Sequence, residues 1–202
     1  MNQTSLFKGK LAANGKERDV EMSAEPEHEQ PPRVIEQRGL WFEDFEPNVV
    51  YRHAPGRTFG EADNTLFSTL TMNPQALHLD ADWSSRQPFG ARLINSMMTL
   101  ATLVGLSVEQ LTQGTIVANL GFSDVRFPAP MYAGDTLRAE TRMLSKRLSN
   151  SRPGEGVVTL EHTGRNQNNV VTAVAVRAVM IRCRPNLGSG ELPSGEELGG
   201  HS

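Results

Sequence analysis

Apolar residues recur at about every second position between Thr115 and Arg182. This period predicts β-strands, and short segments rich in Pro, Gly, Ser and Asn separate the runs and predict hairpin-like turns. An earlier run, Val49, Val50 and Tyr51, ends at Pro55 and Gly56 and predicts an edge strand. The four long predicted strands are residues 115–127, 136–149, 156–165 and 170–182.

Helical spacing comes before these strands. Thr58 and Glu61 have the spacing of a capping box, so a helix is predicted over residues 60–70. Its apolar side consists of Ala62, Leu66, Phe67 and Leu70. The segment from Thr71 to Trp83 keeps neither period, which predicts an irregular loop of the kind that often carries function.

A second helix is predicted over residues 93–106, which are apolar on nearly every side. Asn95 and Ser96 are its only strongly polar pair, so we expect it to be buried on most faces. The order of strand, helix, buried helix and four strands indicates an α+β fold. We expect one curved antiparallel sheet wrapped around the long helix, with an open edge that favours a homodimer or higher homo-oligomer.

Composition limits the fold to one domain with tails. The chain has 202 residues, and the stretches 1–36 and 185–202 are too charged or too rich in Gly and Pro to form a core, so we expect them to be disordered. The folded domain is therefore predicted over residues 37–184.

Charge and cysteine content exclude several classes. A net charge of −3 and no long basic run argue against nucleic-acid binding. The single Cys183 permits no internal disulfide and gives no zinc pattern, so no metal is expected. No apolar run reaches the roughly 20 residues of a membrane span, and residues 1–36 lack the apolar centre of a signal peptide. We therefore expect a cytoplasmic protein without a membrane segment.

His78 is the histidine with the best placement for chemistry, because it lies in the irregular loop five residues after Asn73. It is either a catalytic acid/base or a residue that only braces the loop. His53 and His162 are interpreted as half-buried strand residues, and His28 and His201 lie in the tails.

Two further groups have both a structural and a functional interpretation. Asn95 and Ser96 cap the helix, and the free N–H groups of a helix start also bind a developing oxyanion. The arginines of the predicted strands have two interpretations: they form a solvent-exposed face, or some of them bind a phosphate. Among the basic residues, Arg147 and Arg152 flank a turn of small polar residues that a phosphate can approach, and are the preferred pair.

Three sequence blocks in fixed order carry a family resemblance: A-D-N-T-L-F-S-T-L-T-M-N-P-Q-A-L-H-L-D, F-G-A-R-L-I-N-S-M-M-T-L and V-R-F-P-A-P-M-Y-A-G-D-T-L. Together they resemble the MaoC-like hydratases, which include (R)-specific enoyl-CoA hydratases and dehydratases. The resemblance covers essentially the whole folded part. It implies a hotdog fold, a dimer, and addition of water to, or its removal from, a coenzyme A thioester.

The resemblance also assigns residues. Aligned without gaps, the family's catalytic His falls on His78 and its catalytic Asp on Asn73. A rival alignment needs a two-residue insertion and leaves Thr71 at the Asp position. The family Gly whose N–H polarises the thioester carbonyl becomes Ser96, which keeps a backbone donor. Gln75, Asn95, Arg147 and Arg152 are expected to bind substrate.

The change from Asp to Asn alters the expected chemistry. Asn cannot take a proton, but its amide can hold a water or a carboxylate. Loss of the negative charge removes a repulsion toward a dicarboxylic acyl group, so branched C5 thioesters such as mesaconyl-CoA or itaconyl-CoA are the expected substrates. The resemblance implies no cofactor beyond the coenzyme A of the substrate. The alternatives are a non-catalytic acyl-CoA-binding protein and a thioesterase.

Overall fold

A computed structural model describes residues 32–185. The predicted tails lie outside this range except for residues 32–36 and 185, which form neither helix nor strand. His28 and His201 also lie outside it. The elements are η1 Phe42–Asp44, β1 Val50–Arg52, β2 Arg57–Thr58, α1 Glu61–Leu70, α2 Ala76–Leu79, α3 Ala81–Ser85, α4 Ser96–Leu111, β3 Ile116–Arg126, β4 Thr136–Leu148, β5 Glu155–Arg165 and β6 Val171–Arg182.

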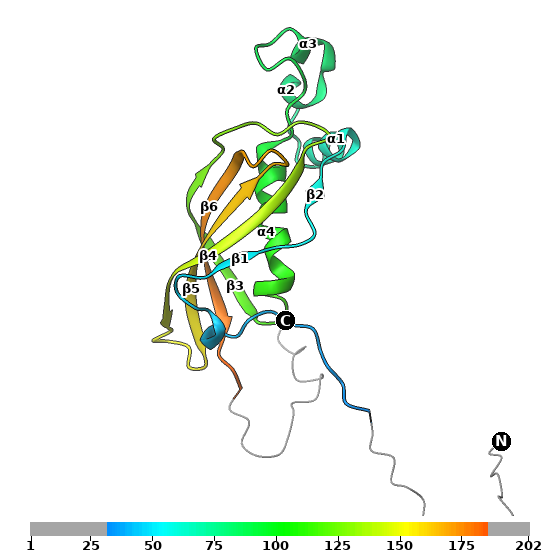
Figure 1. The fold of residues 1–202 in the computed structure, drawn as a ribbon. Coiled ribbons are helices and arrows are strands. Elements are labelled where there is room, and N and C mark those ends of the chain that lie inside the picture. The colour runs from blue at the N-terminus through cyan, green and yellow to red at the C-terminus, as the bar shows by residue number, and fades with distance from the viewer. Residues whose placement is uncertain (1–31, 186–202) are drawn as a thin grey trace, which may run out of the picture. The chain divides into compact units, whose positions relative to one another are not determined.

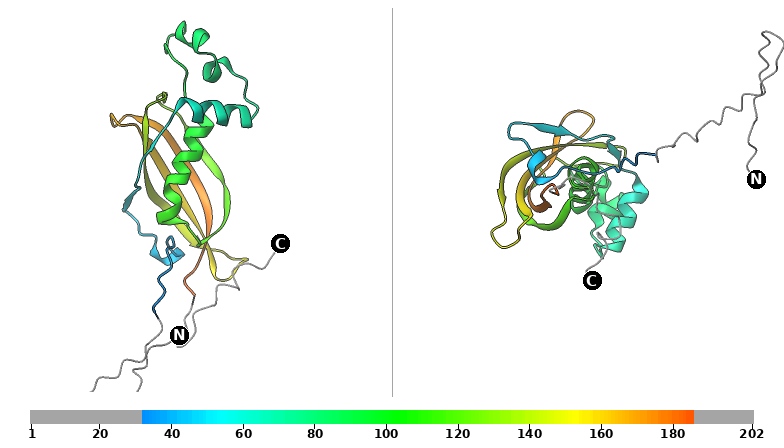
Figure 2. Two further views of the ribbon diagram at one scale, coloured as in Figure 1. Left: turned by 90° about the vertical axis from the view of Figure 1, so that its right-hand side faces the viewer. Right: turned by 90° about the horizontal axis from the view of Figure 1, so that it is seen from below.

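The strands form one antiparallel sheet in the order β1-β4-β5-β6-β3, and β2 also pairs with β4. The sheet curves around α4, which lies against its concave face (Figure 1, and seen from below in Figure 2). The α+β fold class and the wrapped central helix are confirmed. The hairpin-like turns are confirmed between β4, β5 and β6. The prediction of a hairpin is wrong between β3 and β4. β3 lies at one edge of the sheet and pairs with β6, so the connection from β3 to β4 crosses over from one side of the sheet to the other.

Helix α4 begins three residues later and ends five residues later than predicted. Residues 93–95 are extended instead, because the Leu93 N–H donates to Leu77 and the Ile94 N–H donates to Met131. The expectation that this helix is buried on most faces is wrong within a single copy of the chain, because one side of α4 is exposed. Met98, Leu103 and Leu111 face the sheet, whereas Met97 and Ala101 are exposed.

Helix α1 is confirmed, but its start and its inward face are not as predicted. Gly60 is the N-cap residue, and its N–H donates to the Asp63 carboxylate at 2.8 Å, so Thr58 and Glu61 form no capping box. The buried side chains of α1 are Asn64 and Ser68. Leu66 and Leu70, which were expected to face the core, are exposed. Asn64 and Ser68 instead make hydrogen bonds to Leu93 and Asn95 in the segment before α4.

The predicted irregular loop contains two short helices, α2 and α3. Asp80 links them, because its side chain accepts the Trp83 N–H at 2.9 Å and caps α3. Both lie beyond one end of the sheet, next to α1 and the start of α4 (Figure 2). None of the helices in the described part is long and apolar enough to cross a membrane.

The core has two apolar clusters with a polar layer between them. One cluster includes Met98 and Leu103 from the first half of α4, and the other includes Leu111, the last residue of α4. We call the layer between them the polar belt; its residues are Gln110, His53, Thr141, His162, Arg177 and Asn119.

Candidate active site

His78 on α2 is buried, with 8% of its surface exposed. Its Nδ1 lies 2.9 Å from the carbonyl oxygen of Leu93. A carbonyl only accepts hydrogen bonds, so Nδ1 carries the proton and Nε2 has the free lone pair. Nε2 makes no hydrogen bond within residues 32–185 and is not completely buried. His78 can therefore accept a proton through Nε2.

The start of α4 presents a free backbone donor beside this segment. The Asn95 side chain caps the helix by accepting the Met97 N–H at 3.0 Å. The N–H of Ser96, the first helical residue, donates to no acceptor in the part of the chain that the structure describes. The partial positive charge of a helix start adds to this free donor. The capping interpretation is therefore confirmed for Asn95, and the Ser96 N–H is left as an available donor, so its role toward an oxyanion stays a prediction.

Asn73 lies in the turn between α1 and α2. Its Oδ1 accepts the Gln75 N–H at 3.2 Å, and its own N–H donates to the Ser68 carbonyl at 2.9 Å. Because the oxygen is held inside the turn, the amide NH2 is the free end. Asn73 therefore presents a hydrogen-bond donor and no base. Gln75 is exposed, and its carbonyl accepts the His78 N–H.

Sequence reasoning missed the side chains that join these parts. Asn64 of α1 donates to the carbonyls of Leu93 and His78 and accepts the Asn95 N–H. Ser68 accepts from the Asn95 amide at 3.3 Å. The i, i+4 spacing of these two polar residues was the available signal, but the apolar residues of the same helix appeared to define its inner face.

Arg92 was also missed. Its guanidinium donates to the Leu79 carbonyl and pairs with Glu61, so it ties the His78 segment to α1. No pattern in the sequence distinguishes this arginine from the others.

The structure does not bring Arg147 and Arg152 to the site. They flank the β4–β5 turn, at the opposite end of the sheet from α2 (Figures 1 and 2). Arg152 pairs with Glu155, and Arg147 is exposed. Within this chain the length of the sheet therefore separates both arginines from His78, and their role in binding the coenzyme's phosphates stays a prediction.

The two other described histidines belong to the polar belt. His53 bonds Gln110 and Thr141, and Thr141 bonds His162, at 2.7 to 2.8 Å. They are more buried than expected, and His162 is 0% exposed. Burial lowers the pKa of His162 to about 3, and the charge of Arg177 and His53 add to this effect. Burial also lowers the pKa of Arg177 and that of His53, although the hydrogen bond that Gln110 Oε1 accepts from His53 acts in the opposite direction on the His53 pKa.

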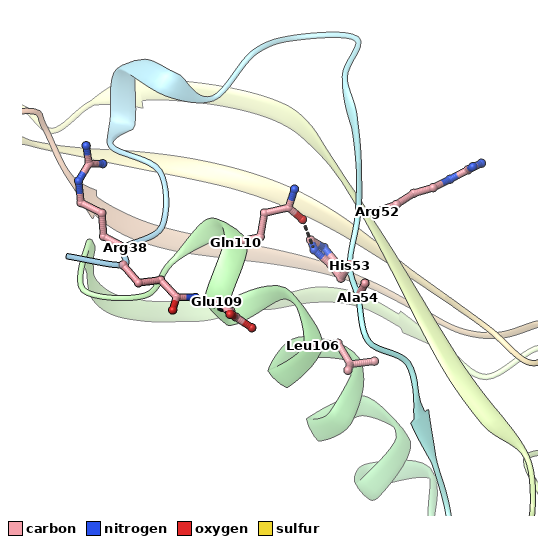
Figure 3. Close-up of a pocket in the computed structure, with 8 residues that line it drawn as sticks. Arg38, Arg52, His53, Ala54, Leu106, Glu109 and Gln110 are labelled. Carbon is pink, nitrogen blue, oxygen red and sulfur yellow. Dashed lines mark hydrogen bonds between the residues drawn. The ribbon is translucent and has the colours of Figure 1, made fainter. Parts of the chain in front are cut away.

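A pocket of about 370 Å³ opens beside His53, at the far end of α4 from His78. Gln110 and Leu106 of α4 are among its lining residues, and Figure 3 shows the hydrogen bond between His53 and Gln110. Its polar lining includes Arg38, Arg52 and Glu109. The pocket shares no residue with the His78 site. Among the described residues, no group of three or more His, Cys, Asp or Glu is placed to bind a metal ion.

Known proteins are similar to this chain in sequence and in fold. The chain is 30% identical over 162 residues to the mesaconyl-CoA hydratase of Cereibacter sphaeroides, which covers 80% of this chain and 47% of that protein. A solved structure of a putative MaoC domain dehydratase from Chloroflexus aurantiacus is 28% identical with a TM-score of 0.70, covering 80% of this chain and 47% of the other.

A further solved structure confirms the fold. It is a conserved hypothetical protein of Mycobacterium tuberculosis with a double hotdog fold, 24% identical with a TM-score of 0.66, and the match covers 77% of this chain and 48% of that one. The chain thus spans less than half the length of the mesaconyl-CoA hydratases that it matches. The model of the MaoC-like domain matches residues 44–166, which include the whole His78 site. The chain therefore belongs to the MaoC-like dehydratase family and has its hotdog fold.

Proposed function

We propose that this protein is a hydro-lyase that adds water to an enoyl-CoA thioester or removes it. The observation that carries the proposal is the hydrogen bond from His78 Nδ1 to the Leu93 carbonyl. This bond leaves Nε2 as a base, while three residues after Leu93 the capped start of α4 presents the Ser96 N–H. A base and an oxyanion donor are thus held by the same short segment, and relatives of similar sequence are named as hydratases of CoA thioesters.

In the hydration direction the thioester oxygen accepts the Ser96 N–H, which draws electrons from the double bond. His78 Nε2 takes a proton from water as the water oxygen bonds the β carbon. The double-bond electron pair then forms the C–H bond at the α carbon with the proton returned by His78. The imidazole ends neutral, so one histidine serves as base and then as acid.

Asn73 positions a group and transfers no proton. Its free amide donates a hydrogen bond to the attacking water or to a carboxylate of the acyl chain. We propose a branched C5 dicarboxylic substrate such as mesaconyl-CoA or itaconyl-CoA, because a neutral donor at this position suits a second carboxylate. Gln75 is proposed to contact the same acyl group from the neighbouring turn position.

The test is the absorbance of the enoyl thioester, followed with mesaconyl-CoA and crotonyl-CoA for the wild type and for His78→Ala. We expect loss of the mesaconyl-CoA band with the wild type and no loss with the variant. A variant as active as the wild type would contradict the role of His78. No turnover with either substrate, together with coenzyme A binding measured by calorimetry, would favour a non-catalytic acyl-CoA-binding protein.

The working unit is proposed to be a homodimer. Met97 and Ala101 of α4 and Leu120 of β3 leave apolar surface exposed. One solved structure of this fold has two hotdog units, and a pair of copies of this domain would reproduce that arrangement. We also propose that the enzyme acts in the cytoplasm on coenzyme A esters and needs no other cofactor.

A further inference from the structure

Asn64 is the most connected polar side chain near His78. It lies on the inner face of α1, and only 1% of its surface is exposed. The proposed mechanism gives it no chemical role. A buried polar side chain persists in a core when its hydrogen bonds are satisfied, so its partners indicate what it does.

The amide of Asn64 contacts the segments that hold both parts of the site. Its Nδ2 donates to the Leu93 carbonyl at 3.0 Å and to the His78 carbonyl at 3.2 Å. Its Oδ1 accepts the Asn95 N–H at 2.9 Å. Both N–H groups and the carbonyl are therefore in use, which fixes the orientation of the amide.

Two of these partners are themselves parts of the site. The Leu93 carbonyl is also the acceptor for His78 Nδ1–H, so Asn64 helps to fix the group that sets the tautomer of His78. Asn95 precedes the Ser96 N–H and caps α4, so Asn64 also fixes the oxyanion donor. One side chain thus connects the base to the helix start.

We infer that Asn64 is a positioning residue that holds the His78 imidazole and the start of α4 in their catalytic register. The inference rests on the proposed function. Correct placement of a base and an oxyanion donor changes rates steeply, and a displacement of about 1 Å can cost about 100-fold. Asn64 itself touches neither the reacting atoms nor, by its burial, the substrate.

Asn64→Asp is the sharpest variant. It keeps the size of the side chain and the acceptor for the Asn95 N–H. Its second oxygen faces the carbonyls of Leu93 and His78 and has no proton to donate, so both donated bonds are lost and repulsion replaces them. Asn166→Asp is the matched control, because the Asn166 Oδ1 in the β5–β6 turn only accepts, from the N–H groups of Asn168 and Val170.

We expect Asn64→Asp to lower kcat by about 10- to 100-fold with KM within about twofold, whereas Asn166→Asp leaves both unchanged. Imidazole ¹⁵N spectra provide a second measurement, with the His78 signals identified by their loss in His78→Ala. The wild type should show the Nδ1–H tautomer, and Asn64→Asp a mixture of the two tautomers.

A folded Asn64→Asp protein with unchanged kcat and unchanged His78 signals would overturn the inference. If Asn64→Asp does not fold, Asn64→Ser replaces it, since its hydroxyl retains one hydrogen bond and leaves space for water. If the wild type hydrates neither thioester, the proposed function fails. The ¹⁵N spectra would then still decide whether Asn64 positions His78.

Discussion

Three described histidines show how surroundings assign different roles to one residue type. His78 donates to a backbone carbonyl and keeps one ring nitrogen free for proton transfer. His53 uses both ring nitrogens in hydrogen bonds inside the core. His162 is completely buried, and its pKa of about 3 keeps it neutral. Only His78 combines a free nitrogen with access to solvent, which is why the proposed proton transfer falls to it.

Asn73→Asp tests the proposed preference for a dicarboxylic substrate. The Asp oxygen can still accept the Gln75 N–H, so the turn should be kept. The new negative charge should repel a second carboxylate, and we expect the ratio of kcat/KM for mesaconyl-CoA to that for crotonyl-CoA to fall about tenfold, or ~1.4 kcal/mol.

The control for this substitution is Asn168→Asp, an equal change of charge at the exposed β5–β6 turn. It should leave the ratio unchanged. A ratio that stays constant in Asn73→Asp, or that rises, would contradict a substrate carboxylate beside Asn73 and favour its role in holding water.

The sequence singled out His78 and Asn73 because they lie close together in one loop, and Asn95 because it lies at a recognisable helix start; their roles in the reaction stay predictions. It did not predict Asn64, whose partners are 14 to 31 residues away and become neighbours only when α1 packs against residues 93–95. The sequence also did not predict where Arg147 and Arg152 lie, because a turn that suits a phosphate does not indicate which end of the sheet it occupies.

At the scale of the element, the spacing of apolar residues predicted four strands and two helices, because burial against one core imposes a regular spacing. The spacing did not predict which face of α1 is buried, since hydrogen bonds of Asn64 and Ser68 replace apolar burial there. It did not predict the partner of β3 either, because a period of two says which face is buried and not which strand is adjacent.

The polar belt crosses β4, β5 and β6 and is expected to make stability depend on pH. The unfolded chain takes up a proton at His162 below pH 6.5, whereas the folded chain does so only near pH 3. The unfolded state therefore binds more protons between these values, and the free energy of unfolding should fall as the pH falls from 6.5 toward 3. His53, whose pKa is also lowered, should contribute in the same direction.

His162→Gln removes this titration and keeps a polar side chain opposite Thr141. We expect its free energy of unfolding to fall less steeply than that of the wild type, by up to about 1.4 kcal/mol per pH unit. Urea titrations between pH 7.5 and 4, at one protein concentration, measure the difference. Carboxylates titrate equally in both proteins, so parallel curves would show that His162 does not control the slope.

At the scale of the molecule, the two edges of the sheet differ. β3 exposes Leu120, Phe122 and Val125, and its outer edge pairs with no strand in residues 32–185. An apolar open edge of this kind favours association with a second copy. Leu120→Asp should therefore convert the proposed homodimer into a monomer, as measured by size-exclusion chromatography with light scattering.

Val50→Asp is the matched control, because Val50 is 55% exposed on β1 at the other edge of the sheet. This variant should remain dimeric. Dissociation by Val50→Asp alone would place the interface at β1, and a monomeric wild type at micromolar concentration would contradict the dimer.

The strand order has a consequence for protein synthesis. β3 is made before β4 and β5, yet its neighbour β6 is the last strand of the described chain. A nascent chain must therefore keep an apolar strand unpaired until residue 182 has left the ribosome, a period in which it is open to aggregation. A premature stop just after residue 166, where the family match ends, would leave every residue of the His78 site in place and β3 without a partner. Such an allele would lose its product through misfolding and not through damaged chemistry.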